Sequence, residues 1–277
     1  ELRALAQERP GRDVWEDLCE QLQGWPDADH LRQVALPYVR AHLDTWPEHL
    51  RALTPAWREA LLAGSLPDQI LSIRSNAITH LDLQGCAVGN EGLSAIARRA
   101  ADDQLTHLGM RNTVLGADSG AILFRHPAFG GLLSLDLSEN VWMRACIDQL
   151  PRAPALRSLT SLKVGHGVAG DAFLNELSLS GSLRYLERLA MPWSDLSDRG
   201  LVALASSRVE SLRALDLNQN PSITPDGLRA LLDSPIAREL SELRLCGISL
   251  GEEGAEAIAS ARFARALGAL YLVGCEL

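Results

Sequence analysis

The sequence predicts an α/β solenoid, a fold in which one short unit of strand and helix is stacked many times. Two observations predict it: a leucine pattern that returns at a nearly constant step, and a helical pattern between successive copies. The pattern LxxLxLxxN/C occurs eight times, and the second leucine of the copies lies at Leu81, Leu108, Leu135, Leu162, Leu189, Leu215, Leu243 and Leu270. The steps are 27, 27, 27, 27, 26, 28 and 27 residues. Such a period indicates a repeat architecture.

Each LxL segment predicts a short strand. Side chains two positions apart on a strand point to the same face, so the leucines of eight parallel strands form one continuous core. The last position of the pattern turns the chain away from the strand. In known repeats of this kind an Asn or Cys there hydrogen-bonds loop backbone, and the matching residues are Cys86, Asn140, Asn220 and Cys275. Thr113 and Ser194 are expected to substitute, whereas the turns at Gly167 and Ile248 should be held less tightly.

The second half of each copy predicts a helix. Segments beginning at Gly89, Ser197, Thr224 and Gly251 open with a capping or turn residue, and acidic residues follow where the helix dipole favours them. One apolar position per repeat forms a column, made of Ile96, Leu123, Leu150, Leu177, Leu204, Leu231 and Ile258. A column of small residues predicts close approach of helix and strand, and it contains Gly92, Cys146, Gly200, Gly227 and Gly254.

These copies resemble the leucine-rich-repeat superfamily, in the long-period, helix-bearing subtype typified by ribonuclease inhibitor and the Ran GTPase-activating protein. The resemblance covers about Ile78 to Leu277. It implies a horseshoe with parallel strands on the concave face and helices on the convex face. It also implies protein binding as the function, although a fold by itself does not prove one.

Residues 1–70 lack the 27-residue period and predict a separate helical domain, while residues 71–277 form the repeat domain. Helical stripes are made by Val14, Leu18 and Leu22, then by Leu31, Val34, Ala35 and Val39, the latter bent or ended by Pro37. A third helix is predicted from Pro55 to Leu62. We expect these helices to cap the open apolar end of the first repeat, because a terminal repeat needs its exposed core covered.

Composition excludes several classes of function. The net charge of −9 leaves no basic footprint for DNA or RNA, so no nucleic-acid partner is predicted. No uninterrupted apolar run approaches the roughly 18–20 residues of a membrane helix, so no membrane association is predicted. The five cysteines form no CxxC pair, which favours a reducing cytoplasm. Lys163 is the only lysine among many arginines, a bias that favours a high-GC bacterial genome.

Catalytic motifs are missing from the sequence: it contains no GxSxG, no P-loop, no HExxH and no GxGxxG in a strand–helix context. We therefore predict neither an enzyme nor a cofactor. His80 and His107 occupy the same position in consecutive repeats, with Asp82 on the same face. They fit either a zinc site or two exposed polar residues that happen to stack, and the second interpretation is favoured, so no metal is predicted.

Two tryptophans differ in their expected roles. Trp142 has the register of Val88, Leu115 and Leu196, which predicts a core position. Trp193 lies at the rim of the concave face, in a column that is otherwise polar or glycine. An exposed tryptophan is a frequent interface residue, so Trp193 fits a binding role and a local packing role equally well.

We predict a protein-interaction module that binds its partner on the concave face, near repeats three to five. The residues expected there are Arg111, Asp136, Lys163, Arg188, Asp216, Arg244 and Tyr271 on the strands, with Glu139, His166 and Trp193 along the rim. Their mixed charges suit a protein epitope better than a polyanion. The alternatives are a GTPase-activating or other enzyme-regulating protein, and the recognition domain of a larger effector enzyme.

The sequence ends just after the turn of the eighth repeat, at Leu277. We expect the last strand to offer an open edge. Either the natural chain continues beyond this point, or the edge pairs with a second copy and the protein self-associates.

Overall fold

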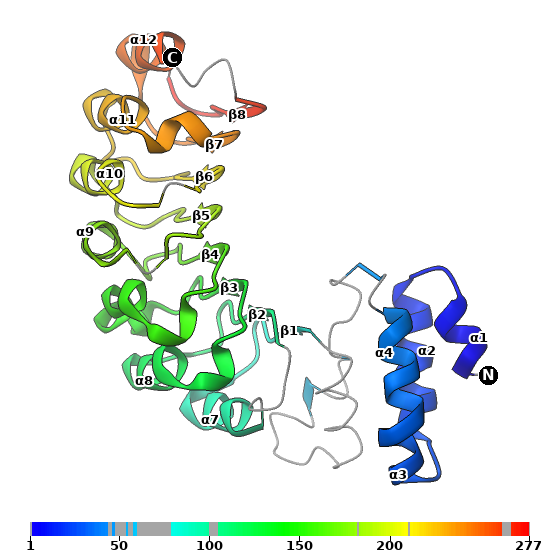
Figure 1. The fold of residues 1–277 in the computed structure, drawn as a ribbon. Coiled ribbons are helices and arrows are strands. Elements are labelled where there is room, and N and C mark those ends of the chain that lie inside the picture. Colours follow the sequence, from blue (N-terminus) through cyan, green and yellow to red (C-terminus); the bar gives the residue numbers. More distant parts are fainter. Residues whose placement is uncertain are drawn as a thin grey trace.

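The computed structural model describes residues 2–43, 46–47, 54, 58–59, 79–99, 105–181, 183–209, 211–261 and 267–276. Eight strands form one parallel sheet in chain order, on the inner side of a curved stack (Figure 1). They are β1 His80–Asp82, β2 His107–Gly109, β3 Ser134–Asp136, β4 Ser161–Lys163, β5 Arg188–Ala190, β6 Ala214–Asp216, β7 Glu242–Arg244 and β8 Ala269–Tyr271. The central leucines pair with one another from Leu81 to Leu270, so the predicted register is confirmed.

Helices cover the outer side of the sheet. They are α7 Gly89–Arg99, α8 Ala117–Arg125, α9 Asp171–Ser180, α10 Asp198–Ala205, α11 Pro225–Leu232 and α12 Gly251–Ser260, with short 3₁₀ turns η4 Pro127–Phe129 and η8 Ile236–Glu239. All seven residues of the predicted apolar column, from Ile96 to Ile258, are buried. Strand leucines and this helical column therefore share one core, as the period predicts.

The third repeat departs from the prediction of one helix per repeat. Three short 3₁₀ segments take the place of an α-helix there: η5 Val141–Ala145, η6 Ile147–Arg152 and η7 Pro154–Leu156. Pro151 lies inside η6 and Pro154 opens η7. A proline inside an α-helix removes a hydrogen bond and clashes with the preceding turn, which explains the tighter and shorter segments.

Two buried asparagines connect the turns of neighbouring repeats. Oδ1 of Asn140 accepts hydrogen bonds from the backbone N–H groups of Thr113 and Leu115, and its Nδ2 donates to the carbonyl of Met110. Asn220 makes the equivalent contacts with Ser194, Leu196 and Met191 of the preceding turn. The asparagine prediction is confirmed.

The other turn positions use smaller side chains or backbone. The hydroxyls of Thr113 and Ser194 donate to backbone carbonyls, as predicted for substitutes, and Sγ of Cys275 donates to the carbonyl of Leu245. Gly167 donates its backbone N–H to the carbonyl of Trp193 at 2.7 Å, and Ile248 fills the core. That these last two turns are held less tightly stays a prediction.

The glycine column has a different role from the one predicted. A Cβ added to Gly200 would collide with the carboxylate of Asp171, and one added to Gly227 would collide with that of Asp198. The close approach at these two positions is therefore between consecutive repeats at the helix N-termini, and the prediction of helix–strand contact was wrong for them. The absent side chain leaves room for Asp171 to accept hydrogen bonds from the N–H and hydroxyl of Ser197.

The N-terminal part is helical, as predicted. Figure 1 shows these helices as a group outside the repeat stack: α1 Leu2–Gln7, α2 Arg12–Gln23, α3 Ala28–His30, the π-helical η1 Leu31–Ala35, and α4 Leu36–Leu43. Leu18, Leu22 and Val39 are buried, but Val34 is exposed, so its assignment to the apolar stripe was wrong. Pro37 does not end the helix, because the wider π-helical turn just before it accommodates the missing N–H.

Two further predictions concern the join between the two parts. Most of the helix predicted from Pro55 to Leu62 lies outside the described residues, and so do residues 60–78, which connect to the repeats. The cap over the first repeat therefore stays a prediction.

In the described part of the chain, no helix combines the length and apolar character needed to cross a membrane.

Candidate functional site

The concave face is built from two side chains of each strand, one on either side of the buried central leucine. Of the predicted residues, Arg188 precedes its leucine. Those that follow it are Asp136, Lys163, Asp216, Arg244 and Tyr271. Hydrogen-bonded strands lie about 4.8 Å apart, so neighbouring members of a column touch. The structure thus brings these residues onto one continuous surface.

A hollow of about 640 Å³ lies over β4 to β7. Lys163, Arg188, Asp216 and Arg244 contribute its charged lining, while Ala190 and Ala214 form part of its wall. Glu187 and Glu242 also line it, and the sequence analysis did not select them. Glu242 could have been selected from the sequence, because it directly precedes the central leucine of its strand, as Arg188 does. The hollow therefore carries charges of both signs around small apolar residues.

Three of these six charged residues, Lys163, Glu242 and Arg244, are already paired. Nε of Arg244 donates to Oε1 of Glu242 at 2.7 Å, and the guanidinium lies 4.5 Å from the ring centre of Tyr271. The hydrogen bond to Glu242 raises the pKa of Arg244. Nζ of Lys163 lies 3.9 Å from Oδ2 of Asp136. Within the described residues Arg188 forms no ion pair, so its guanidinium is the cation most available to a partner.

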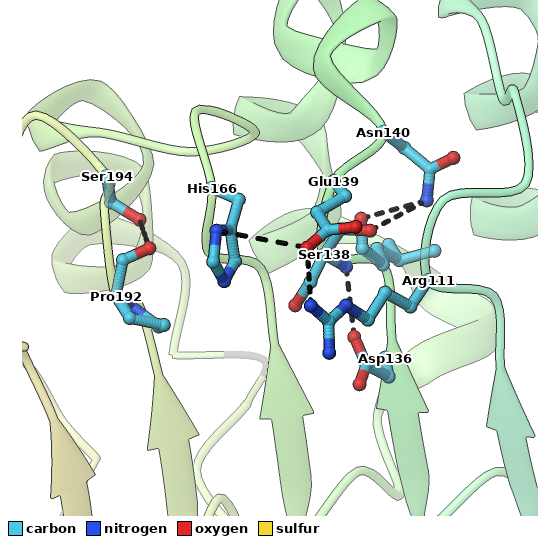
Figure 2. A network of polar contacts seen from close by, with 9 residues as sticks. Arg111, Asp136, Ser138, Glu139, Asn140, His166, Pro192 and Ser194 are labelled. Carbon is cyan, nitrogen blue, oxygen red and sulfur yellow. Dashed lines mark hydrogen bonds and ion pairs between the residues drawn. The ribbon is translucent and has the colours of Figure 1, made fainter. Parts of the chain in front are cut away.

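The rim carries a second polar group, drawn in Figure 2. Nη2 of Arg111 donates to Oε1 of Glu139 at 2.5 Å, and Nδ1 of His166 lies 4.0 Å from the same oxygen. This hydrogen bond lowers the pKa of Glu139 and raises that of Arg111. Glu139 is thus ionised and accepts a hydrogen bond from Arg111, and His166 lies beside it. Arg111 was predicted on a strand, but it lies two residues beyond the end of β2, in the turn, where it joins the predicted rim residues Glu139 and His166.

One turn position per repeat has a left-handed backbone. The φ angles at this position lie between 52° and 73°, and the residues are Gly85, Asn112, Glu139, His166, Trp193, Gln219, Gly247 and Gly274. Residues with a Cβ rarely adopt this conformation, apart from Asn, Asp and His. Register analysis identified the column but not its conformation. Glu139, Trp193 and Gln219 therefore hold their places at a conformational cost that glycine would avoid.

Trp193 is 55% exposed, so more than half of its surface is accessible to a partner. The binding interpretation of this residue stays a prediction. Trp142 is 71% exposed, and the prediction of a core position for it was wrong. The 3₁₀ turn of the third repeat shifts the buried position by one residue, and Met143 fills the core in its place.

His80 and His107 stack face to face, with ring centres 3.8 Å apart. The Nδ1 atoms lie 3.1 Å and 2.9 Å from the hydroxyls of Thr79 and Thr106, respectively. In the region that the structure describes, no cluster of three or more His, Cys, Asp or Glu side chains is arranged to hold a metal ion. The stacked arrangement is the favoured alternative of the sequence analysis.

Comparisons with known proteins address the fold. The family model for the leucine-rich repeat matches residues 74–97 and 210–232. A comparison with curated proteins finds no match. Among solved structures, the chain is similar to the leucine-rich repeat-containing protein LegL7 from Legionella pneumophila, at 17% identity and a TM-score of 0.54, over 92% of this chain and 86% of that one.

Two further structures are similar at lower scores. Internalin C2 from Listeria monocytogenes is 15% identical with a TM-score of 0.43, covering 79% of this chain and 93% of that one. TLR13 in complex with ssRNA13 is 17% identical with a TM-score of 0.41, covering 83% of this chain and 34% of that one.

The likeness to LegL7 extends over most of both chains, and at 17% identity it shows the fold alone. Eight LxxLxL units in register, one parallel sheet in chain order and the two family matches agree with it. The chain carries leucine-rich repeats, and its fold is the leucine-rich-repeat solenoid.

Proposed function

We propose that this chain is a protein-interaction module and that its partner docks in the hollow of the concave face, over β4 to β7. The observation that carries the proposal is the hollow itself: about 640 Å³, lined by charges of both signs. A protein epitope complements such a mixed surface, whereas a polyanion needs a continuous basic stripe.

Two features support a specific partner. Arg188 forms no ion pair among the described residues, and a carboxylate on the partner would complete it. Ala190 and Ala214 leave room beside it for a partner side chain. Three other predicted residues, Lys163, Asp216 and Arg244, also line the hollow and would fix the orientation of the partner. No metal or cofactor enters the proposal.

Cross-linking tests the location. A photo-reactive amino acid replaces Ala190 in the hollow or Val202 on the outer helix α10, which is the control position. In a bacterial lysate, we expect a discrete adduct from position 190, suppressed by the added substitution Arg188→Glu, and none from position 202. An adduct from position 202 alone, or an adduct from position 190 that ignores Arg188→Glu, contradicts docking in the hollow.

The repeat subtype, the source and the cellular location of the chain are also part of this proposal. Its period and its helices favour the ribonuclease-inhibitor-like subtype, its arginine-rich composition favours a bacterial source, and its five cysteines without a CxxC pair favour a reducing cytoplasm. A binding role fits the described surface better than a catalytic one, because the strand side chains supply recognition groups over a wide area.

A further inference from the structure

We propose that the hollow binds an extended segment of the partner that carries an acidic and a basic side chain two positions apart. The acidic side chain pairs with Arg188 and the basic one with Asp216. This inference rests on the proposed function, because it assumes docking in the hollow, and it deepens that function by naming the chemistry of the segment that docks.

Arg188 and Asp216 are diagonal neighbours on the floor of the hollow. Arg188 precedes the central leucine of β5, and Asp216 follows that of β6. Ala190 and Ala214 occupy the other two corners, since Arg188 pairs with Ala214 and Ala190 pairs with Asp216. A strand spacing of about 4.8 Å and a rise of about 6.6 Å over two residues place the two charged positions roughly 8 Å apart. One diagonal of the floor thus carries a cation and an anion, and the other carries two small side chains.

Neither of these charges has an ion-pair partner among the described residues. Arg188 is exposed, whereas Asp216 is half-buried and accepts one backbone hydrogen bond through Oδ1. Arg244 follows Asp216 in the same row of the sheet, but it donates to Glu242 and lies over the ring of Tyr271. Both charges are therefore left for groups of a partner.

A partner that covers the hollow removes both charges from water, and a charge left unpaired in an interface is costly. A segment that offered only a carboxylate would compensate Arg188 and leave Asp216 without a counter-charge. Side chains two positions apart on an extended segment point to the same face, about 6.6–7 Å from each other. That spacing is close to the diagonal of the floor, and Ala190 and Ala214 leave room for the backbone of the segment to approach.

Glu187 is a further anion of the hollow that forms no ion pair within the described part of the chain. It directly precedes β5, so it lies outside the two rows of strand side chains that contain Arg188 and Asp216. We expect Asp216 rather than Glu187 to select the basic side chain, and Glu187 therefore provides a matched control.

A peptide array probed with the full chain tests this inference. Each short peptide carries one glutamate and one lysine in a background of alanine and threonine, and these charges are adjacent or separated by one or two residues. Further peptides carry two glutamates or two lysines separated by one residue. The variants are Arg188→Glu and Asp216→Lys, and the controls are Glu187→Lys and Val202→Glu on α10. Thermal unfolding confirms that each variant is folded.

We expect peptides with one residue between the glutamate and the lysine to bind about tenfold or more tightly than peptides with adjacent charges. Arg188→Glu should shift the preference to two lysines, and Asp216→Lys should shift it to two glutamates. Glu187→Lys and Val202→Glu should change the affinities by less than about threefold.

The outcomes separate this inference from the proposed function. If Arg188→Glu abolishes binding but Asp216→Lys leaves the preference unchanged, or Glu187→Lys alters it as strongly, the inference is overturned and docking in the hollow stands. Equal binding of mixed-charge peptides at every spacing also overturns it. If neither Arg188→Glu nor Asp216→Lys changes binding, the peptides dock elsewhere and the inference fails, while cross-linking from position 190 judges the hollow separately.

Discussion

At the scale of residues, the left-handed turn position has two requirements that conflict. Its backbone conformation favours glycine, whereas binding requires a side chain. Glycine fills it in the first and the last two repeats, where Gly85, Gly247 and Gly274 adopt positive φ without strain. Glu139 and Trp193 fill it in the middle of the stack, where backbone conformation alone would favour glycine. That cost supports our proposal that these side chains serve binding.

Val114, two residues beyond this position in the second repeat, has φ of 59° and offers a direct test of that cost. Val114→Gly should raise the free energy of unfolding by about 1 kcal/mol, because relief of the left-handed strain exceeds the entropy that glycine loses on folding. Val141 has the same register in the next repeat but no positive φ, so Val141→Gly should lower stability by about 0.5–1 kcal/mol. Urea denaturation measures both. Equal losses in the two variants would show that Val114 is not strained.

Much at this scale could be predicted from the sequence. The buried leucines and the turn asparagines follow from side-chain period and polarity, which the sequence displays directly. Trp142 was misassigned because a 3₁₀ turn changes the phase of the pattern by one residue. The left-handed column was not predicted, although glycine at three of its eight positions and asparagine at a fourth were a signal for positive φ.

At the scale of elements, hydrogen bonds join the N-termini of α9, α10 and α11 in series. Asp171 accepts from Ser197, and Asp198 accepts from Thr224, each through an N–H and a hydroxyl. The sequence predicted caps within single helices but not these bonds between repeats, because they depend on how the helices stack. The sequence contains the prolines of the third repeat, but it did not predict that 3₁₀ turns replace the α-helix there.

The strand core gives the second stability test. Leu162 in the central strand β4 is fully buried, so Leu162→Ala should lower the free energy of unfolding by about 2–5 kcal/mol through lost burial and a residual cavity. Its exposed neighbour Lys163 is the matched control, and Lys163→Ala should change stability by less than about 0.5 kcal/mol. A loss below about 0.5 kcal/mol for Leu162→Ala would contradict the register of the repeats.

At the scale of the whole molecule, the sheet ends at β8. The outer edge of this strand faces no further strand among the described residues, and Leu270 and Leu272 are only partly buried beside it. An uncovered strand edge next to apolar side chains is a template for pairing with another chain. The order of the strands was predictable from the period alone, whereas the pairing of this edge depends on what lies beside it in solution.

We expect a chain of residues 1–277, in which β8 is the last described strand, to self-associate through that edge. Light scattering over a concentration series should show mass rising with concentration, and Val273→Lys should suppress the rise because charge on an exposed edge blocks pairing. Val202→Lys, on the outer helix α10, is the control and should leave association unchanged. A constant monomer mass at high concentration contradicts association through β8.

The asparagine contacts between turns run in one direction. Asn140 binds the backbone of Thr113, which precedes it by 27 residues, and Asn220 reaches back in the same way to Ser194. The backbone N–H groups of the turns at Thr113 and Ser194 therefore gain these protein partners only after the ribosome has added the next repeat. During synthesis the hydrogen bonds of these two turns would close behind the growing end of the chain. The side-chain hydrogen bonds between these repeats would therefore form in the order in which the repeats are translated.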